Sequence, residues 1–159
     1  MNQVVVKQEK SGYQIVEAYK SLRTNLQFCG EDKKVIAITS CTPNEGKSSV
    51  SMQLGISLAE IGKRVILIDA DLRKSVLLGR TKTEKSVRGL AHFLSGQASL
   101  EDVICATNIK NFYMIYSGPF PPNPAELLGG KNFRSLLNAL RKVYDYVIVD
   151  PPPLGSVID

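Results

Sequence analysis

The sequence predicts an α/β fold built on a mainly parallel sheet with helices on both faces. The first observation is a set of four short runs whose central residues are apolar in succession, as in strands buried on both faces. These runs are residues 35–40, 64–69, 112–118 and 145–150. The second observation is that segments with helical spacing separate the runs, which is the order that gives parallel strands and crossover helices.

The chain of 159 residues is expected to form one domain, residues 15–159, after a flexible N-terminus of residues 1–14. Apolar positions at helical spacing predict a first helix at 15–28. The further helices are expected in a segment that ends near residue 61, at 89–96, at 99–104, and as one long helix from 124 to 143.

Composition limits the kind of partner and the compartment. The net charge of +5 favours anionic partners but is too small to indicate nucleic acid. Cys29, Cys41 and Cys105 are widely spaced and odd in number, which is typical of reduced cytosolic thiols. No apolar run approaches the ~20 residues that cross a bilayer. If the protein works at a membrane, another component must hold it there.

The strongest chemical signal is the loop "CTPNEGKSS" between the first strand and its helix. It matches the phosphate-binding pattern Gly-x-x-x-x-Gly-Lys-Ser except that Cys41 replaces the first glycine. Gly46 allows the backbone to approach a phosphate, Lys47 can reach the β- and γ-phosphates, and the Ser48 hydroxyl suits Mg²⁺. The expected nucleotide-binding residues of this loop are Pro43, Asn44, Glu45, Gly46, Lys47, Ser48 and Ser49.

Three aspartates stand at the carboxyl ends of two predicted strands. Asp69 and Asp71 end one strand segment, and Asp150 ends another. Ligands of parallel sheets bind at this edge, so these carboxylates should meet the Lys47 loop and suit Mg²⁺ beside phosphates. The plainer alternative for each aspartate is a turn or helix cap after a strand.

Three motifs give the sequence a specific resemblance. "TPNEGKSS", "VILIDADLR" and "YDYVIVDPPP" resemble, in order and spacing, the Walker A, Walker A′ and Walker B motifs of bacterial protein-tyrosine kinases of capsule and exopolysaccharide synthesis. "GLAHFLSG" and "GPFPPNPAELL" resemble linking segments of that family, so the resemblance covers nearly the whole chain. It implies a P-loop NTPase fold, ATP and Mg²⁺ as cofactors, and phosphoryl transfer to tyrosine hydroxyls in autophosphorylation.

The resemblance also implies a role for each matching residue. Lys47 would stabilise charge on the β- and γ-phosphates, and Asp71 would orient or deprotonate the tyrosine hydroxyl. Asp69 would complete the catalytic set. The metal ligands would be Ser48, Asp69 and Asp150, directly or through water.

Two features beyond the phosphate site have both a functional and a plain interpretation. Arg73 would steady a phosphate or the acceptor segment, or is a surface arginine. Glu17, Lys20 and Arg23 resemble the family's Glu-x-x-Arg-x-x-Arg oligomer motif, with a lysine that lacks the bidentate fork of arginine. Their alternative is a solvated helix face with pairs at i,i+3 spacing.

The implied partners are a transmembrane polysaccharide co-polymerase or adaptor, other copies in a homo-oligomeric ring, and the tyrosine-rich tail of a neighbouring kinase subunit. The implied location is the cytoplasmic face of the plasma membrane, reached through the adaptor, and no nucleic acid is expected. The chain's six tyrosines form no terminal cluster. They are Tyr13, Tyr19, Tyr113, Tyr116, Tyr144 and Tyr146.

Two other functions remain open on the sequence. The first is a regulatory ATPase of the partition and septum-site class, which shares the fold. Proteins of that class carry a second lysine in the phosphate-binding loop, at the position where this chain has Thr42. A nucleotide-binding partner of the co-polymerase without phosphoryl transfer is the other alternative. Since the family continues past its third motif, we expect a chain truncated after the Walker B strand, with residues 35–40 as an exposed apolar edge.

Overall fold

The structure is a computed structural model that describes residues 1–6, 13–30, 35–38, 47–72, 81–83, 88–119 and 121–150. Within helices and strands, the side chains of residues 13–16, 18, 19, 47–49 and 81–83 lie outside this description. The strands are β1 (Asn2–Val6), β2 (Val35–Ala37), β3 (Val65–Asp69), β4 (Thr81–Thr83), β5 (Cys105–Thr107), β6 (Phe112–Ile115) and β7 (Tyr146–Asp150). The helices are α1 (Tyr13–Phe28), α2 (Lys47–Glu60), α3 (Leu90–Leu94), α4 (Leu100–Val103), α5 (Pro124–Leu128) and α6 (Lys131–Arg141).

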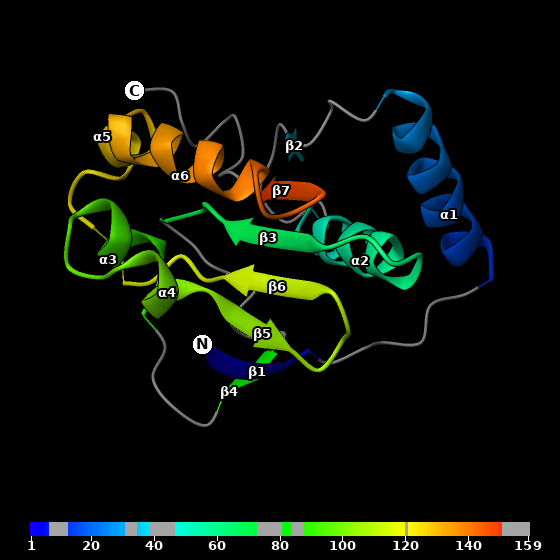
Figure 1. Cartoon of the computed structure of the whole chain (residues 1–159), viewed down its shortest axis with the longest axis horizontal. Helices are drawn as coiled ribbons and strands as arrows, with labels where there is room; N and C mark the ends of the chain where they lie inside the picture. Colours follow the sequence, from blue (N-terminus) through cyan, green and yellow to red (C-terminus); the bar gives the residue numbers. More distant parts are fainter. Residues whose placement is uncertain are drawn as a thin grey trace.

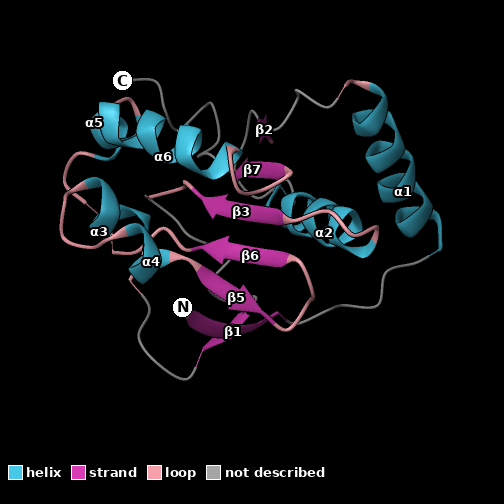
Figure 2. Cartoon of the chain, viewed as in Figure 1, coloured by secondary structure: helices cyan, strands magenta, loops and turns pink. Residues whose placement is uncertain are grey.

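All the described strands join one sheet in the order β2-β7-β3-β6-β5-β1-β4 (Figure 1). The four strands from β2 to β6 in that order are parallel, β5 runs antiparallel to β6, and β4 runs antiparallel to β1. Helices lie on both faces of the sheet (Figure 2). The predicted mainly parallel α/β fold is therefore confirmed.

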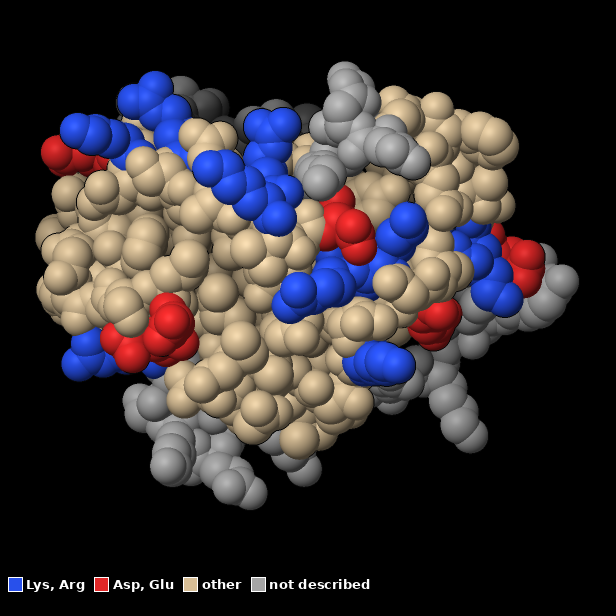
Figure 3. All heavy atoms as spheres, viewed as in Figure 1, with Lys and Arg blue, Asp and Glu red and all other residues tan. Residues whose placement is uncertain are grey.

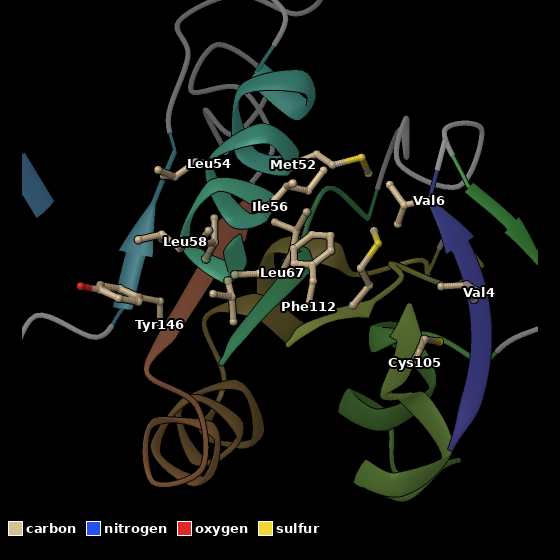
Figure 4. Close-up of a cluster of buried hydrophobic side chains, with 14 of the residues drawn as sticks. Val4, Val6, Met52, Leu54, Ile56, Leu58, Leu67, Cys105, Phe112 and Tyr146 are labelled. Atoms are coloured by element: carbon tan, nitrogen blue, oxygen red, sulfur yellow. The ribbon is translucent and has the colours of Figure 1, made fainter. Parts of the chain in front are cut away.

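Each sheet face buries its own core, because alternate side chains of a strand point to opposite faces. On β3, Val65 and Leu67 join the core under α2, whereas Ile66 and Ile68 join the core under α3 and α6. Figure 4 shows the first of these cores, where side chains of α2 and the sheet surround Phe112. The central strands are thus buried on both faces, as their continuous apolar runs indicate.

The expectation that the N-terminus is flexible is wrong for residues 2–6. These residues form β1, which lies between β5 and β4 in the sheet. Val4 and Val6 are each 2% exposed and belong to the α2-side core. The Val6 amide donates to the Asn108 side chain at 2.7 Å. Three consecutive valines, a residue type that favours strands, thus anchor a segment that its polar neighbours suggested to be flexible.

The expected long helix from 124 to 143 is also two helices. α5 ends before Gly129 and Gly130, and α6 starts after them. Glycine lowers helix propensity by about 1 kcal/mol relative to alanine, so two in succession favour a break here. β4 and β5 were not predicted, because three-residue strands carry too little pattern to be recognised.

The strand β2 lies at one end of the sheet and pairs, within the described residues, with β7 alone. The Val35 side chain is 38% exposed there. The expected exposed apolar edge is therefore present in this part of the chain. None of the helices described has the length and apolarity needed to span a bilayer.

Candidate functional site

The candidate site lies at the carboxyl edge of the sheet, where α2 begins. α2 starts at Lys47 and ends at Glu60, and β3 follows after a turn in which Gly62 has a φ of +87°. Because this turn is short, α2 runs back along the sheet, and its N-terminus lies toward the carboxyl ends of the strands. A helix N-terminus with its free N–H groups favours anions such as phosphate.

Two buried carboxylates from neighbouring strands share this edge. Asp69 of β3 and Asp150 of β7 are register partners, and each is 1% exposed. Leu67 and Ile148, two residues earlier, both belong to the α2-side core, so strand alternation directs both carboxylates toward α2. The site thus brings together two anions and the N-terminus of α2.

Carboxylate oxygens are ligands that Mg²⁺ prefers, and two carboxylates on adjacent strands can share one cation. Across the described residues there is no cluster of three or more His, Cys, Asp and Glu side chains suited to a metal. A Mg²⁺ ion held by Asp69 and Asp150 would therefore take its other ligands from water, phosphate and Ser48, which is how Mg²⁺ is commonly bound.

Asp71 is joined to Asp69 by a local hydrogen bond. The Asp71 amide donates to Asp69 Oδ1 at 3.2 Å, and the Ala70 amide donates to the Asp150 carbonyl at 2.9 Å. Asp71 itself is partly exposed, unlike the two buried aspartates. The turn after β3 therefore holds one partly exposed aspartate beside two buried ones.

The other predicted residues of the site are placed only in part. The backbone of Lys47, Ser48 and Ser49 forms the first turn of α2. The predicted loop residues Pro43, Asn44, Glu45 and Gly46, and also Arg73, lie outside the described residues.

Sequence reasoning missed that the start of α3 is hydrogen-bonded to the segment that follows β6 at this edge. The Leu90 and Ala91 amides at the start of α3 donate to the carbonyls of Tyr116 and Ser117 at 2.6 and 2.9 Å. A Cβ on Gly89 would stand 2.3 Å from the Gly118 amide nitrogen, so only glycine fits. The glycines that flank these segments were the available signal, because a close approach of two backbones requires them.

The predicted oligomer trio is divided between two environments. Glu17 and Lys20 pair with each other at 3.7 Å, with both side chains about half exposed. Arg23 donates to the Ser57 carbonyl of α2 at 3.0 Å and lies 3.4 Å from the Ser57 hydroxyl. Arg23 thus ties α1 to α2 within one chain, and a role of the trio in oligomer contacts stays a prediction.

The comparisons with known proteins agree with this fold and edge. A family model described as an AAA domain matches residues 33–159. The chain is 44% identical over 143 residues to the tyrosine-protein kinase CpsD of Streptococcus agalactiae, a match that covers 90% of this chain and 62% of CpsD. It also superposes on the BceF tyrosine kinase domain with a TM-score of 0.80 and 42% identity, over 88% of this chain and 56% of that one.

A more distant likeness joins the same fold to regulatory ATPases. The septum site-determining protein MinD of Pyrococcus horikoshii, solved with Mg-ADP, gives a TM-score of 0.62 at 27% identity over 76% of this chain and 49% of MinD. Fold and edge together define a nucleotide-binding domain of the P-loop class. The chain belongs to the AAA-domain family and is a relative of the bacterial tyrosine-protein kinases, and it spans less than two thirds of CpsD.

Proposed function

We propose that this chain is the ATP-binding part of a bacterial protein-tyrosine kinase of capsule or exopolysaccharide synthesis. The observation that carries the proposal is the register pair Asp69 and Asp150, buried at the edge where α2 begins at Lys47. The names of its relatives support the kinase activity and the capsule system.

In this proposal the residues divide the work of phosphoryl transfer. Lys47 and the N-terminus of α2 hold the phosphates and offset the charge that develops on them. Ser48, Asp69 and Asp150 hold Mg²⁺, which when bound neutralises phosphate charge. Asp71, whose backbone N–H donates a hydrogen bond to Asp69 Oδ1, accepts the proton of the incoming tyrosine hydroxyl.

The partners belong to the proposal as well. A transmembrane co-polymerase or adaptor would hold the kinase at the inner face of the plasma membrane. A homo-oligomer would bring the tyrosine-rich tail of one kinase subunit to the edge of another. Similarity to the putative tyrosine-protein kinase in the cps region of Klebsiella pneumoniae and to the putative tyrosine-protein kinase EpsB of Ralstonia solanacearum supports this setting.

The test is phosphotyrosine formation from ATP and Mg²⁺ by the full chain, with the adaptor's cytoplasmic segment and a tyrosine-rich peptide present. Lys47→Ala should lower the rate at least about 100-fold, and Asp71→Asn by a similar factor, because each removes electrostatic or general-base catalysis. Glu101→Gln, on an exposed side chain of α4, is the matched control and should retain the rate. Transfer that survives Lys47→Ala or Asp71→Asn would refute the assigned roles.

The likeness to MinD supports a second candidate, a regulatory ATPase without a tyrosine acceptor. The same assay separates the two functions if released inorganic phosphate is measured beside phosphotyrosine. Lys47-dependent phosphate release without phosphotyrosine favours the ATPase. Nucleotide binding without either product favours a non-catalytic partner of the adaptor.

A further inference from the structure

The outer face of α6 carries a stripe of basic side chains that the proposed catalytic site does not use. Lys131, Arg134, Arg141 and Lys142 are all exposed. At 100° per residue these four positions fall within an arc of about 100°, which makes them one stripe along the helix. We call these four residues the α6 ridge.

The ridge stands opposite the face of α6 that anchors it to the sheet. Leu136 and Leu140 are each 1% exposed and join the core under α3 and α6. The basic stripe is therefore held at a fixed angle to the sheet, and it extends over about 16 Å from Lys131 to Lys142. In Figure 1, α6 lies on the outside of the sheet.

Local stability does not account for these charges. α6 has no acidic residue in its first turn, where Lys131 and Arg134 face the positive end of the helix dipole. Within the described part of the chain, no ion pair involves any of the four ridge residues. The basic residues of α1 differ, because Lys20 pairs with Glu17 and Arg23 bonds to Ser57.

The form of the ridge decides what kind of partner it fits. Two pairs of cations, at the two ends of one side of an exposed helix, can contact a flat anionic surface at the same time. Lys and Arg atoms gather over α6 in Figure 3. We propose that the α6 ridge binds the anionic headgroups of a membrane surface directly.

This contact is electrostatic and leaves the candidate site free. The ridge positions carry no large apolar side chain to insert among lipid tails, so binding should depend steeply on salt. α6 runs back along the sheet toward β7 (Figure 1), so the bilayer would lie alongside the strands, and the edge with Asp69 and Asp150 would open beside it. The proposal does not rest on phosphoryl transfer.

Cosedimentation of the full chain with vesicles tests the proposal. Vesicles of phosphatidylcholine mixed with phosphatidylglycerol should bind the chain, and vesicles of phosphatidylcholine alone should not. A Lys or Arg near an anionic surface strengthens binding about fivefold, so the double variant Lys131→Gln/Arg134→Gln should bind roughly 25-fold more weakly at low salt. Lys131→Arg/Lys142→Arg keeps all four charges and should bind as the unchanged chain does.

The matched control is Lys63→Gln/Lys110→Gln, which removes the same net charge from solvent-accessible positions outside α6. If the control weakens binding as much as the ridge variant does, net charge and not the ridge is responsible, and the proposal fails. It also fails if both vesicle types bind equally, or if poly-glutamate binds the ridge while vesicles do not. Thermal unfolding of each variant checks that it folds, and phosphotyrosine formation without vesicles reports separately on the catalytic site.

Discussion

At the scale of single residues, Asp69 has two functions that substitutions can separate. Its carboxylate accepts a hydrogen bond from the backbone amide of Asp71, and it is the register partner of Asp150 as a candidate ligand of Mg²⁺. Asp69→Asn keeps an oxygen that can accept this hydrogen bond, whereas Asp69→Ala leaves the Asp71 amide without an acceptor. We expect Asn to change the free energy of unfolding little and Ala to lower it by about 1–3 kcal/mol.

Mg-ADP should raise the thermal midpoint of the unchanged chain, and both Asp69 variants should lose that rise, because both remove a charge proposed to hold Mg²⁺. Thermal unfolding with and without Mg-ADP measures the two effects together. A Mg-ADP-dependent rise that persists in Asp69→Asn would argue against a metal site here.

Buried thiol and phenol groups predict a loss of stability at alkaline pH. Burial raises the pKa of the Cys105 thiol from 9.0 to about 11, and it raises the pKa of Tyr144 and Tyr146 as well. As pH rises above 9, the unfolded chain loses these protons first, so the stability present below that pH declines. Urea unfolding between pH 8 and 11 should show the decline, with a smaller slope in Cys105→Ala. An equal slope in that variant would remove Cys105 as a cause.

The residues that sequence reasoning placed well are those whose chemistry follows from strand ends. Asp69 and Asp150 could be assigned to one edge because parallel strands end together, and the register confirms it. The hydrogen bond from the Asp71 amide to Asp69 could not be predicted, because it depends on the backbone conformation of one turn. The hydrogen bond of Arg23 to Ser57 could not be predicted either, since it depends on how α1 packs against α2.

At the scale of elements, α2 fits the sheet closely at one glycine. A Cβ added to Gly55 would stand 2.5 Å from Phe112 Cε1, in a ring that is 1% exposed and has little room to move. Gly55→Ala should lower the free energy of unfolding by about 1–3 kcal/mol despite the better helix propensity of alanine. Chemical unfolding measures this change.

Phe112→Leu supplies the control for Gly55→Ala, because it makes space opposite the new methyl group. The double variant should lose less stability than the sum of the two single variants. Additive losses would mean that the close contact between α2 and β6 is not what the alanine disturbs.

The bond between Arg23 and Ser57 makes a separate prediction about α1. Arg23→Ala should lower the free energy of unfolding of the single chain by about 1–2 kcal/mol, because it leaves the Ser57 carbonyl without its charged donor. Unfolding at several protein concentrations measures this change. A loss that appears only at high concentration, together with a smaller oligomer, would assign Arg23 to contacts between chains instead.

Elements with long patterns were predictable and short ones were not. α1, α2 and the central strands carry enough apolar residues to show their period, and each lies close to its expected bounds. β1 was missed because its three valines stand among polar residues. The break between α5 and α6 was missed because apolar residues occur on both sides of Gly129 and Gly130. In both places tertiary contacts or glycine conformation outweighed the local pattern.

At the scale of the whole molecule, the two hydrophobic cores support different parts of the protein surface. The α2-side core supports the edge with Asp69 and Asp150, and the core under α3 and α6 supports the α6 ridge. The strand β2 offers a third surface, since its outer edge pairs with no other strand among the described residues and such an edge can accept another strand. The proposed catalysis, the proposed membrane contact and association can therefore be tested by substitutions in different elements.

The most direct test of the central claim is calorimetric titration of the chain with ATP, with and without Mg²⁺. The paired carboxylates and the start of α2 at Lys47 predict binding that is strengthened by Mg²⁺. They also predict that Asp150→Asn removes this strengthening, and that Lys47→Ala weakens binding under both conditions. Equal affinity with and without Mg²⁺, unchanged in Asp150→Asn, would contradict a Mg-nucleotide site at the carboxyl edge of this sheet.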